Sequence, residues 1–255
     1  MAREYRFFTS EIGVAELGGA DLEFSAVKES DIFNQLVKVL RVKPDDTVVL
    51  LCGSNVFGET NYDEFVYVVT NAHKKGVGMR FVDSRMNENE LGRELELILC
   101  LPNKPEKLSF IIQKAVELGV NSISLVNGDF SRMKHGLRED RLMKIMKEAS
   151  EQSERGFVPT LKIDGRLSDL LESGIKKGRK PLIALEKMIK PKYLEELIKD
   201  DLKSAVSIVV GPEGGFSEEE KNLFSKKNLP CFSLGKRVLR METAVILALG
   251  IAGLK

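Results

Sequence analysis

The sequence predicts an α/β protein in which a mostly parallel sheet is covered on both faces and a smaller β-rich unit precedes it. Two observations support this class. From residue 95 onward, short apolar segments alternate with amphipathic segments at helical spacing, which is the pattern of strands joined by crossover helices. Before residue 84, short β-branched and aromatic segments are separated by Gly, Asn and Asp. With 255 residues, 43% of them hydrophobic, the chain is long enough for one large domain or two small ones.

The first part of the chain is predicted to contain three strands and one helix. The strand candidates are residues 47–53, 64–72 and 78–83. The helix comes before them, because apolar residues recur at helical spacing from Ile32 to Leu40 and the turn-forming sequence KPDD follows. This part is therefore expected to form a small β-rich unit.

The pattern changes after the polar stretch 84–94, which is the best candidate for a linker. Beyond it, the strand candidates are residues 95–101, 122–126, 182–185, 205–210 and 231–234. Each precedes a helix candidate. Three of these helices are predicted in residues 105–119, 138–154 and 192–199, and two more are predicted to begin at residue 217 and at about residue 242. Gly119 fits a C-terminal cap of the first of these helices. Five such alternations predict the parallel sheet.

Charge is balanced over the whole chain but not along it. The net charge is +1, which gives no global signal for nucleic acid. Residues 1–90 hold 10 basic and 15 acidic side chains, whereas the remainder holds 29 basic and 23 acidic ones. The second part is therefore the expected place for an anionic partner.

The cysteines, the histidines and the apolar segments indicate which cellular compartment and which metal or membrane association to expect. Cys52, Cys100 and Cys231 are odd in number and widely spaced, which predicts buried free thiols in a reducing cytoplasm. The chain has two histidines and no Cys/His cluster with metal-ligand spacing, so no metal is expected. The N-terminus shows no signal peptide, and the longest apolar stretch, Ala244 to Leu254, is shorter than the roughly 20 residues that span a bilayer. We therefore expect a cytoplasmic protein without a membrane segment.

The stretch SIVVGPEGGFSEEE, residues 207–220, is the first candidate ligand site. Ser217 and Glu220 match a capping box, so a helix is predicted to begin just after the glycines. A strand, a glycine-rich turn and a helix start are the usual surroundings of a ligand site at the carboxyl end of a strand. Neither a Walker A loop nor the G-x-G-x-x-G order is present, and Glu213 would repel a polyphosphate. A neutral or cationic ligand suits this loop, and a plain glycine turn is the alternative.

The stretch FSLGKRVLRMETAVILALGIAGL, residues 232–254, repeats the layout of strand, glycine, loop and helix. Three basic residues crowd its loop, namely Lys236, Arg237 and Arg240. They are candidates for a ligand contact, and the alternative is a solvated loop whose arginines pair with Glu213 or Glu242. The helix that follows is apolar nearly all round, so it is expected to be buried in the core or in a subunit interface.

A third stretch, EASEQSERGFVP in residues 148–159, ends a predicted helix. Gln152, seven residues after Ile145, continues the apolar stripe and is therefore predicted to be buried with hydrogen-bond partners. It either holds a loop in place or meets a ligand. The basic run upstream is typical of a solvated helix face, and phosphate contact by Arg132 and Lys134 is the second interpretation.

Four motifs carry a resemblance to a known family. NKPEKLSFIIQKAVELGV, EASEQSERGFVP, VVGPEGGFSEEE and SLGKRVLRMETA have the order and spacing of the 16S rRNA (uracil-N3)-methyltransferase family, often called RsmE. LVKVLRVKPDD resembles the start of that family's PUA-like RNA-binding barrel. The resemblance covers essentially the whole chain. It implies a PUA-like β-barrel in residues 1–86 and a trefoil-knotted SPOUT α/β methyltransferase domain in residues 87–255.

The resemblance also implies the chemistry and the partners. The family is homodimeric and uses S-adenosyl-L-methionine to methylate N3 of a uridine in 16S rRNA, as free RNA or in the small ribosomal subunit, with no metal. The positions that it assigns to the donor are Leu185, Glu186, Gly211, Glu213, Gly214, Gly215, Leu234, Gly235, Val238 and Leu239. Glycines there would let backbone groups reach the adenine and ribose directly.

The reaction suggests roles for the charged residues of these motifs. The uracil must lose its N3 proton, and negative charge then spreads onto O2 and O4. We expect Arg240 to stabilise that charge, with Arg237 or Arg155 nearby, and Glu242 or Glu213 to accept the proton. An ion pair between Arg240 and Glu242 is the alternative. The residues expected to contact RNA are Arg132, Lys134, Arg155 and Arg237.

The chain departs from the family pattern in three places. Phe33 and Asn34 stand where a His pair is usual, KPDD in residues 43–46 replaces the commoner KPGD, and Glu154 and Phe157 replace a Gly and an Arg. The last change puts one RNA or subunit contact in doubt. Two other functions stay open, a methyltransferase of this class that acts on a different RNA or base and a non-catalytic RNA-binding module.

Overall fold

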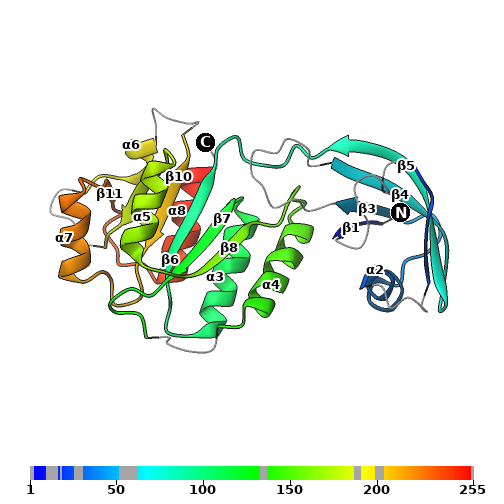
Figure 1. Ribbon diagram of the computed structural model, residues 1–255, viewed down its shortest axis with the longest axis horizontal. Helices are drawn as coiled ribbons and strands as arrows, with labels where there is room; N and C mark the ends of the chain where they lie inside the picture. Colours follow the sequence, from blue (N-terminus) through cyan, green and yellow to red (C-terminus); the bar gives the residue numbers. More distant parts are fainter. Residues whose placement is uncertain are drawn as a thin grey trace. The chain divides into compact units, whose positions relative to one another are not determined.

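The computed structural model divides into two compact units (Figure 1). The first comprises Met1–Glu90 and Ser150–Val158, and the second comprises Leu91–Ala149 and Pro159–Lys255. The residues that the structure describes are 3–9, 17, 19–25, 31–51, 63–132, 137–186, 191–198 and 204–253. Each unit has its own sheet and its own apolar core.

The first unit is built on a five-stranded sheet with the order β1-β3-β4-β5-β2. Its strands are β1 (Glu4–Phe8), β2 (Leu22–Ser25), β3 (Thr47–Leu51), β4 (Asp63–His73) and β5 (Gly76–Met86). β1 pairs with β3 in parallel, and the other pairs are antiparallel. The three predicted strands are confirmed as β3, β4 and β5, whereas β1 and β2 were not predicted.

The long β4–β5 hairpin gives this sheet its shape. Its register shifts between Val66 and Tyr67 and again between Val69 and Asn71. Such irregularities bend a strand and increase its local twist. The predicted helix is present as α2 (Asp31–Phe33) followed by the π-helical segment η2 (Asn34–Leu40).

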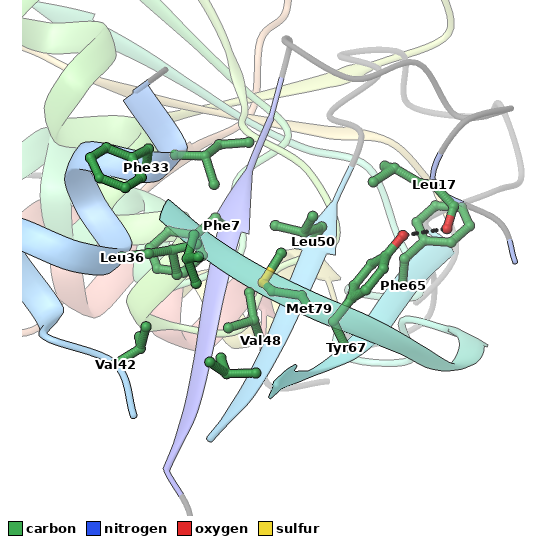
Figure 2. Packing of buried hydrophobic residues seen from close by; sticks show 13 residues of the cluster. Phe7, Leu17, Phe33, Leu36, Val42, Val48, Leu50, Phe65, Tyr67 and Met79 are labelled. Carbon is green, nitrogen blue, oxygen red and sulfur yellow. Dashed lines mark hydrogen bonds between the residues drawn. The ribbon is translucent and has the colours of Figure 1, made fainter. Parts of the chain in front are cut away.

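The core of the first unit lies between the sheet and this helical segment (Figure 2). Phe33 and Leu36 of the helical segment belong to one cluster with Phe7 of β1, and all three are buried. The Tyr67 hydroxyl, on the opposite side of the cluster, donates a hydrogen bond to the Leu17 carbonyl. Phe33, which departs from the family pattern, is only 1% exposed, so in this chain the position serves the apolar core.

A buried carboxylate joins the strands of the first unit. Glu64 accepts hydrogen bonds from Arg6, from Arg85 Nε at 2.8 Å and from Asn87 Nδ2 at 2.5 Å. Burial by itself disfavours ionisation, but the three donors outweigh it and lower the pKa of Glu64. The carboxylate is therefore a charged element of the fold.

The second unit holds a six-stranded sheet with the order β11-β9-β10-β6-β7-β8. Its strands are β6 (Leu95–Cys100), β7 (Ser122–Val126), β8 (Thr160–Gly165), β9 (Lys180–Ala184), β10 (Val206–Val210) and β11 (Cys231–Phe232). Every neighbouring pair is parallel, which confirms the predicted parallel sheet. The predicted strands correspond to all of them except β8, which was missed together with the helix after it.

Helices cover both faces of this sheet. They are α3 (Pro105–Glu117), α4 (Glu139–Gln152), α5 (Leu167–Lys176), α6 (Leu194–Ile198), α7 (Glu218–Lys226) and α8 (Met241–Gly253). On one face, Ile98 and Val209 of the sheet share a core with Leu171 of α5 and Phe224 of α7. On the other face α8 packs against β10, and α3 packs against α8. Gly119 has a φ of +87° just after α3, as its predicted capping position requires.

Two predictions about individual residues need correction or qualification. Gln152 is exposed at the end of α4, because the buried stripe of that helix runs through Met146, Ala149 and Ser150 and passes beside it. Cys100 is a buried free thiol, whereas Cys231 is only half-buried, and Cys52 lies outside the described residues. Burial, with a contribution from Glu220 and Asp129, raises the pKa of the Cys100 thiol, which makes it a poor nucleophile.

Candidate functional site

A cavity of about 860 Å³ opens in the second unit beyond the carboxyl ends of β9, β10 and β11. Four segments line it, namely residues 103–107 after β6, 184–186 after β9, 210–218 after β10 and 232–244 around the start of α8. The carboxyl edge of a parallel sheet is where ligands bind in open α/β folds. The volume is within the range of roughly 300–1,000 Å³ that is typical of small-molecule sites.

The glycine-rich turn after β10 forms one wall of this cavity. Gly215 has a φ of +73° and donates a backbone hydrogen bond to Pro212 at 2.9 Å. A Cβ at Gly211 would lie 3.1 Å from the Phe216 ring, and a Cβ at Gly214 would lie 3.0 Å from Phe130 Cβ. A side chain at Gly211 or Gly214 would therefore require its neighbour to shift by a few tenths of an ångström, whereas at Gly215 the positive φ disfavours a side chain.

The helix after the turn begins with the predicted capping box. The Ser217 hydroxyl accepts from the Glu220 amide at 3.1 Å, and Glu220 Oε2 accepts from the Ser217 amide at 2.8 Å. Burial raises the pKa of Glu220. The capping box fixes where the turn ends and α7 starts.

A second glycine loop faces the turn. Gly235 has a φ of +119°, and its amide donates to the Ser233 hydroxyl at 3.3 Å while that hydroxyl donates to the Gly235 carbonyl at 3.0 Å. The Leu185 amide donates to the Phe232 carbonyl at 2.9 Å, which ties the end of β9 to β11. The loop is therefore held tightly by its own hydrogen bonds.

Glu213 does not point freely into the cavity. Its carboxylate accepts from Lys107 Nζ at 2.7 Å and from the Asn103 amide at 3.2 and 3.3 Å. Burial opposes ionisation, but these donors outweigh it and lower the pKa of Glu213, and the ion pair raises the pKa of Lys107. Glu213 thereby links the glycine turn to the start of α3.

Lys107 also reaches the first turn of α8. Its Nζ lies 3.5 Å from Glu242 Oε2, so one ammonium group bridges two carboxylates from different segments. Within the described part of the chain, no ion pair joins Arg240 to Glu242 or to Glu213. The bridging cation is instead a lysine that the sequence analysis had not singled out.

Sequence reasoning missed the contribution of the segment after β6. Asn103, Lys104 and Lys107 all line the cavity. A signal was available, because cations in the first turn of a helix are unfavourable to the helix dipole unless an anion lies nearby. Two lysines at the start of α3, directly after a central strand, therefore indicate acidic partners at the edge of the sheet.

All ten positions assigned to the donor by resemblance line this one cavity, and Arg237, Arg240 and Glu242 line it as well. Arg132 is exposed in the segment between β7 and α4, and Lys134 lies outside the described residues. Arg155 belongs to the first unit, where it is 3% exposed. Its Nη2 lies 2.7 Å from Glu90 Oε2, and its guanidinium lies 4.6 Å from the centre of the Phe157 ring.

The charges around the cavity are mixed. The basic side chains are Lys104, Lys107, Lys221, Arg237 and Arg240, and the acidic ones are Glu186, Glu213, Glu218 and Glu242. This balance suits a ligand that carries both signs of charge better than it suits a polyphosphate. Among the residues that the structure describes, no group of His, Cys, Asp and Glu has a metal-binding arrangement, and no helix is long and apolar enough to cross a bilayer.

Comparison with known proteins defines the class to which this fold and cavity belong. The model of the RNA methyltransferase domain family matches residues 89–253, which include the whole cavity. "Ribosomal RNA small subunit methyltransferase E" of Bacillus subtilis is 30% identical, with 85% of this chain and 84% of the relative covered. The protein of that name from Mesomycoplasma hyopneumoniae is 29% identical over 84% of this chain and 87% of its own. The chain belongs to this family of ribosomal RNA methyltransferases, which confirms the resemblance.

A solved structure extends the comparison to the fold. The ribosomal RNA small subunit methyltransferase E of Neisseria gonorrhoeae, bound to S-adenosyl methionine, superimposes with a TM-score of 0.79 at 25% identity. The match covers 97% of this chain and 95% of that one. Both units of the present chain therefore have counterparts in the relative.

Proposed function

We propose that the protein transfers a methyl group from S-adenosyl-L-methionine to N3 of a uridine in the 16S rRNA of the small ribosomal subunit. The observation that carries this proposal is the cavity, where the glycine turn after β10 and the loop before α8 face each other. A related chain of the same family is known bound to S-adenosyl methionine.

The residues present fit the donor. Gly215 and Gly235 line the cavity and have open space where a Cβ would lie, which suits close contact of their backbone with adenine and ribose. Leu185 and Leu239 supply apolar lining. Charged side chains of both signs surround the space, in keeping with a molecule that carries a sulfonium, an ammonium and a carboxylate. When bound, S-adenosylmethionine supplies an activated methyl group.

We assign the proton acceptor to Glu242 rather than to Glu213. Glu213 is occupied by Lys107 and by the Asn103 amide, so its oxygens already have donors. Glu242 contacts only one of these groups, Lys107, at the longer distance of 3.5 Å. A carboxylate within reach of the uracil can take the N3 proton directly or through one water.

We propose that Arg240 stabilises the negative charge that develops on the uracil oxygens. It lines the cavity, its side chain is exposed, and among the described residues it has no carboxylate partner. A guanidinium stays protonated and offers fixed donors, which is what a developing anion needs. Arg155, by contrast, is committed to Glu90 and to the Phe157 ring, and we propose that it stabilises the first unit.

Contacts to RNA phosphates are proposed for Arg132, Lys134 and Arg237. Arg132 and Arg237 are exposed, and cations at the surface neutralise phosphates with little desolvation cost. We place the protein in the cytoplasm, because ribosomal RNA of the small subunit is assembled there.

The finer architecture is also a proposal. We propose that residues 1–86 form a PUA-like barrel, which the bulged five-stranded sheet supports. We also propose that residues 87–255 form a trefoil-knotted SPOUT domain, which is supported by the loops after β9, β10 and β11 that line one cavity. We further propose a homodimer that uses α8. That helix is apolar on most sides, and Leu247 is 41% exposed on it.

Two measurements test the function. Calorimetric titration with S-adenosylmethionine should show saturable binding, and an Ala substitution at Gly235, whose φ of +119° disfavours any side chain, should weaken it. Small subunits from cells that lack the enzyme should then acquire 3-methyluridine, detected by mass spectrometry of nucleosides. A different methylated nucleoside would assign another base. RNA binding without donor binding would instead indicate a non-catalytic RNA-binding module.

A further inference from the structure

An aromatic side chain beside the cavity has no role in the proposed chemistry. Phe130 lies between β7 and α4, and half of its surface, 50%, is exposed to solvent. Exposing a phenylalanine ring of this size forgoes a substantial gain in hydrophobic burial. Single exposed apolar residues are common on proteins, so exposure alone does not indicate a site. The surroundings of Phe130 supply the further observations.

The buried side of Phe130 rests on the glycine turn. A Cβ at Gly214 would lie 3.0 Å from Phe130 Cβ and 3.5 Å from Cγ and Cδ2, so the side chain packs directly on the Gly214 backbone. Gly214 itself lines the cavity. The exposed ring is therefore separated from the proposed donor site by a single residue of backbone.

The segment that carries Phe130 is held in place on both sides of the ring. The Ser131 amide donates to the Gly128 carbonyl at 2.9 Å, and the Gly128 amide donates to the Ser131 hydroxyl at 3.1 Å. The Asp129 amide donates to Glu220 Oε1 at 3.3 Å, and the Ser217 hydroxyl donates to the Asp129 carboxylate. The ring is thus presented on a fixed turn, with little conformational entropy left to lose on binding.

We propose that Phe130 is a stacking platform for an unpaired base of the substrate RNA, next to the uridine that enters the cavity. This inference rests on the proposed function. N3 lies on the Watson–Crick edge of uracil, so the target must be unpaired and drawn out of its stack. Its neighbours then lose a stacking partner, and an aromatic face can replace it for any base. Arg132, exposed two residues further on, is placed to meet the phosphate of the same nucleotide.

The chain offers a direct probe of this contact because it contains no tryptophan. A Phe130→Trp variant carries a single indole at the proposed platform. Protein-free 16S rRNA added to this variant should quench its fluorescence saturably, since a stacked base quenches an indole. The control is Phe110→Trp, which places the single indole at the other phenylalanine exposed within the described residues, on α3 and 43% exposed. Its emission should change little.

A second variant measures what the platform contributes. Phe130→Leu keeps an apolar side chain on Gly214 but removes the aromatic face. We expect the affinity for 16S rRNA to fall about tenfold, in the middle of the range for losing one base stack. KM for the RNA should rise similarly, whereas the affinity for S-adenosylmethionine should stay within about twofold of wild type. Phe130→Trp should restore the RNA affinity, and Phe110→Leu should not alter it.

The outcomes separate this inference from the function on which it rests. If Phe130→Trp is not quenched at RNA concentrations that saturate the protein, or if Phe130→Leu binds RNA as wild type does, the platform is refuted. A wild-type protein that neither binds the donor nor methylates RNA would refute the proposed function instead. The quenching experiment needs no donor, so it retains its meaning in that case.

Discussion

Each unit contains a cluster of charged side chains, and the two clusters differ in how completely their carboxylates are bound. In the first unit, Glu64 is 3% exposed and accepts hydrogen bonds from three side chains of the same sheet region. In the second, Glu213 accepts hydrogen bonds from Lys107 and from the Asn103 amide, whereas Glu242 at the same cavity wall contacts only Lys107 among the described residues, at 3.5 Å. A fully bound, buried carboxylate joins strands, whereas a partly bound one at a cavity keeps capacity for a ligand or a proton. We propose that Glu64 serves the fold and that Glu242 serves the reaction.

The largest effect is expected from breaking the cluster of the first unit. Glu64→Ala leaves Arg6, whose side chain is 7% exposed, without its buried partner, and removing one member of a buried ion pair costs about 3–5 kcal/mol. Thermal unfolding followed by circular dichroism should show the loss. The matched control is Glu4→Ala, whose exposed carboxylate pairs with the same arginines and should contribute less than about 1 kcal/mol. If Glu64→Ala and Glu4→Ala lost the same amount of stability, burial of the carboxylate would not determine its contribution.

Arg240→Ala should be the strongest change in the second unit. Loss of one donor to a developing anion typically lowers kcat by about 10²–10³-fold, and we expect that loss with little change in the affinity for S-adenosylmethionine. Methyl transfer to small subunits and calorimetry give the two quantities. Lys236→Ala removes an exposed cation from the same loop and should leave kcat nearly unchanged. A parallel fall of kcat and donor affinity would contradict the assigned role of Arg240.

Lys107→Met sharpens the comparison at the shared lysine. Without the ammonium, Glu213 and Glu242 repel each other and the glycine turn loses its link to α3. The affinity for the donor should fall about tenfold, as for the loss of a charge-assisted hydrogen bond worth about 1.5 kcal/mol. The Lys107→Arg variant should retain most of the affinity for the donor. Lys114→Met, on the same helix but paired only with Glu117 among the described residues, should bind the donor normally.

The smallest effect concerns pH, and it has opposite signs for two buried carboxylates, Glu64 and Glu220. The pKa of Glu64 is lowered, so its contribution to stability is present above about pH 4.5 and is lost as the pH falls through its folded pKa. The pKa of Glu220 is raised, so this group by itself adds relative stability to the second unit on acidification and loses it as the pH rises through that pKa, which offsets the opposite contribution of Glu213, whose pKa is lowered. Hydrogen exchange at pH 7 and pH 4 should therefore show a larger loss of protection in the first unit. Equal losses would mean that other groups dominate.

The sequence predicted the second unit better than the first. Strands β6, β7, β9 and β10 are mostly apolar segments that precede helices, and this pattern can be recognised without knowledge of tertiary contacts. The five-residue strand β1 is extended because it pairs with β3, more than 35 residues later in the chain. Such a pairing leaves no local pattern that a sequence window can detect.

The candidate site was predictable where it depends on backbone geometry. Glycines at positions 211, 214, 215 and 235 mark close approaches and positive φ angles, so the two loops could be identified from their residues and from the family resemblance. Lys107 and Arg155 could not be assigned in this way. Their partners are Glu213 and Glu90, which lie far away in the sequence, and a charged residue reveals its partner only when the fold is known.

The contact between Gly214 and Phe130 restricts how the two positions can change during evolution. The short distance involves Phe130 Cβ, an atom that every residue except glycine possesses. Shrinking the ring at position 130 would therefore not make room for a side chain at position 214. As long as the turn keeps its present path, a side chain at position 214 requires Phe130 Cβ to shift by a few tenths of an ångström, unless position 130 is itself glycine. Among relatives we accordingly expect paired substitutions, in which a side chain gained at 214 accompanies a glycine at 130.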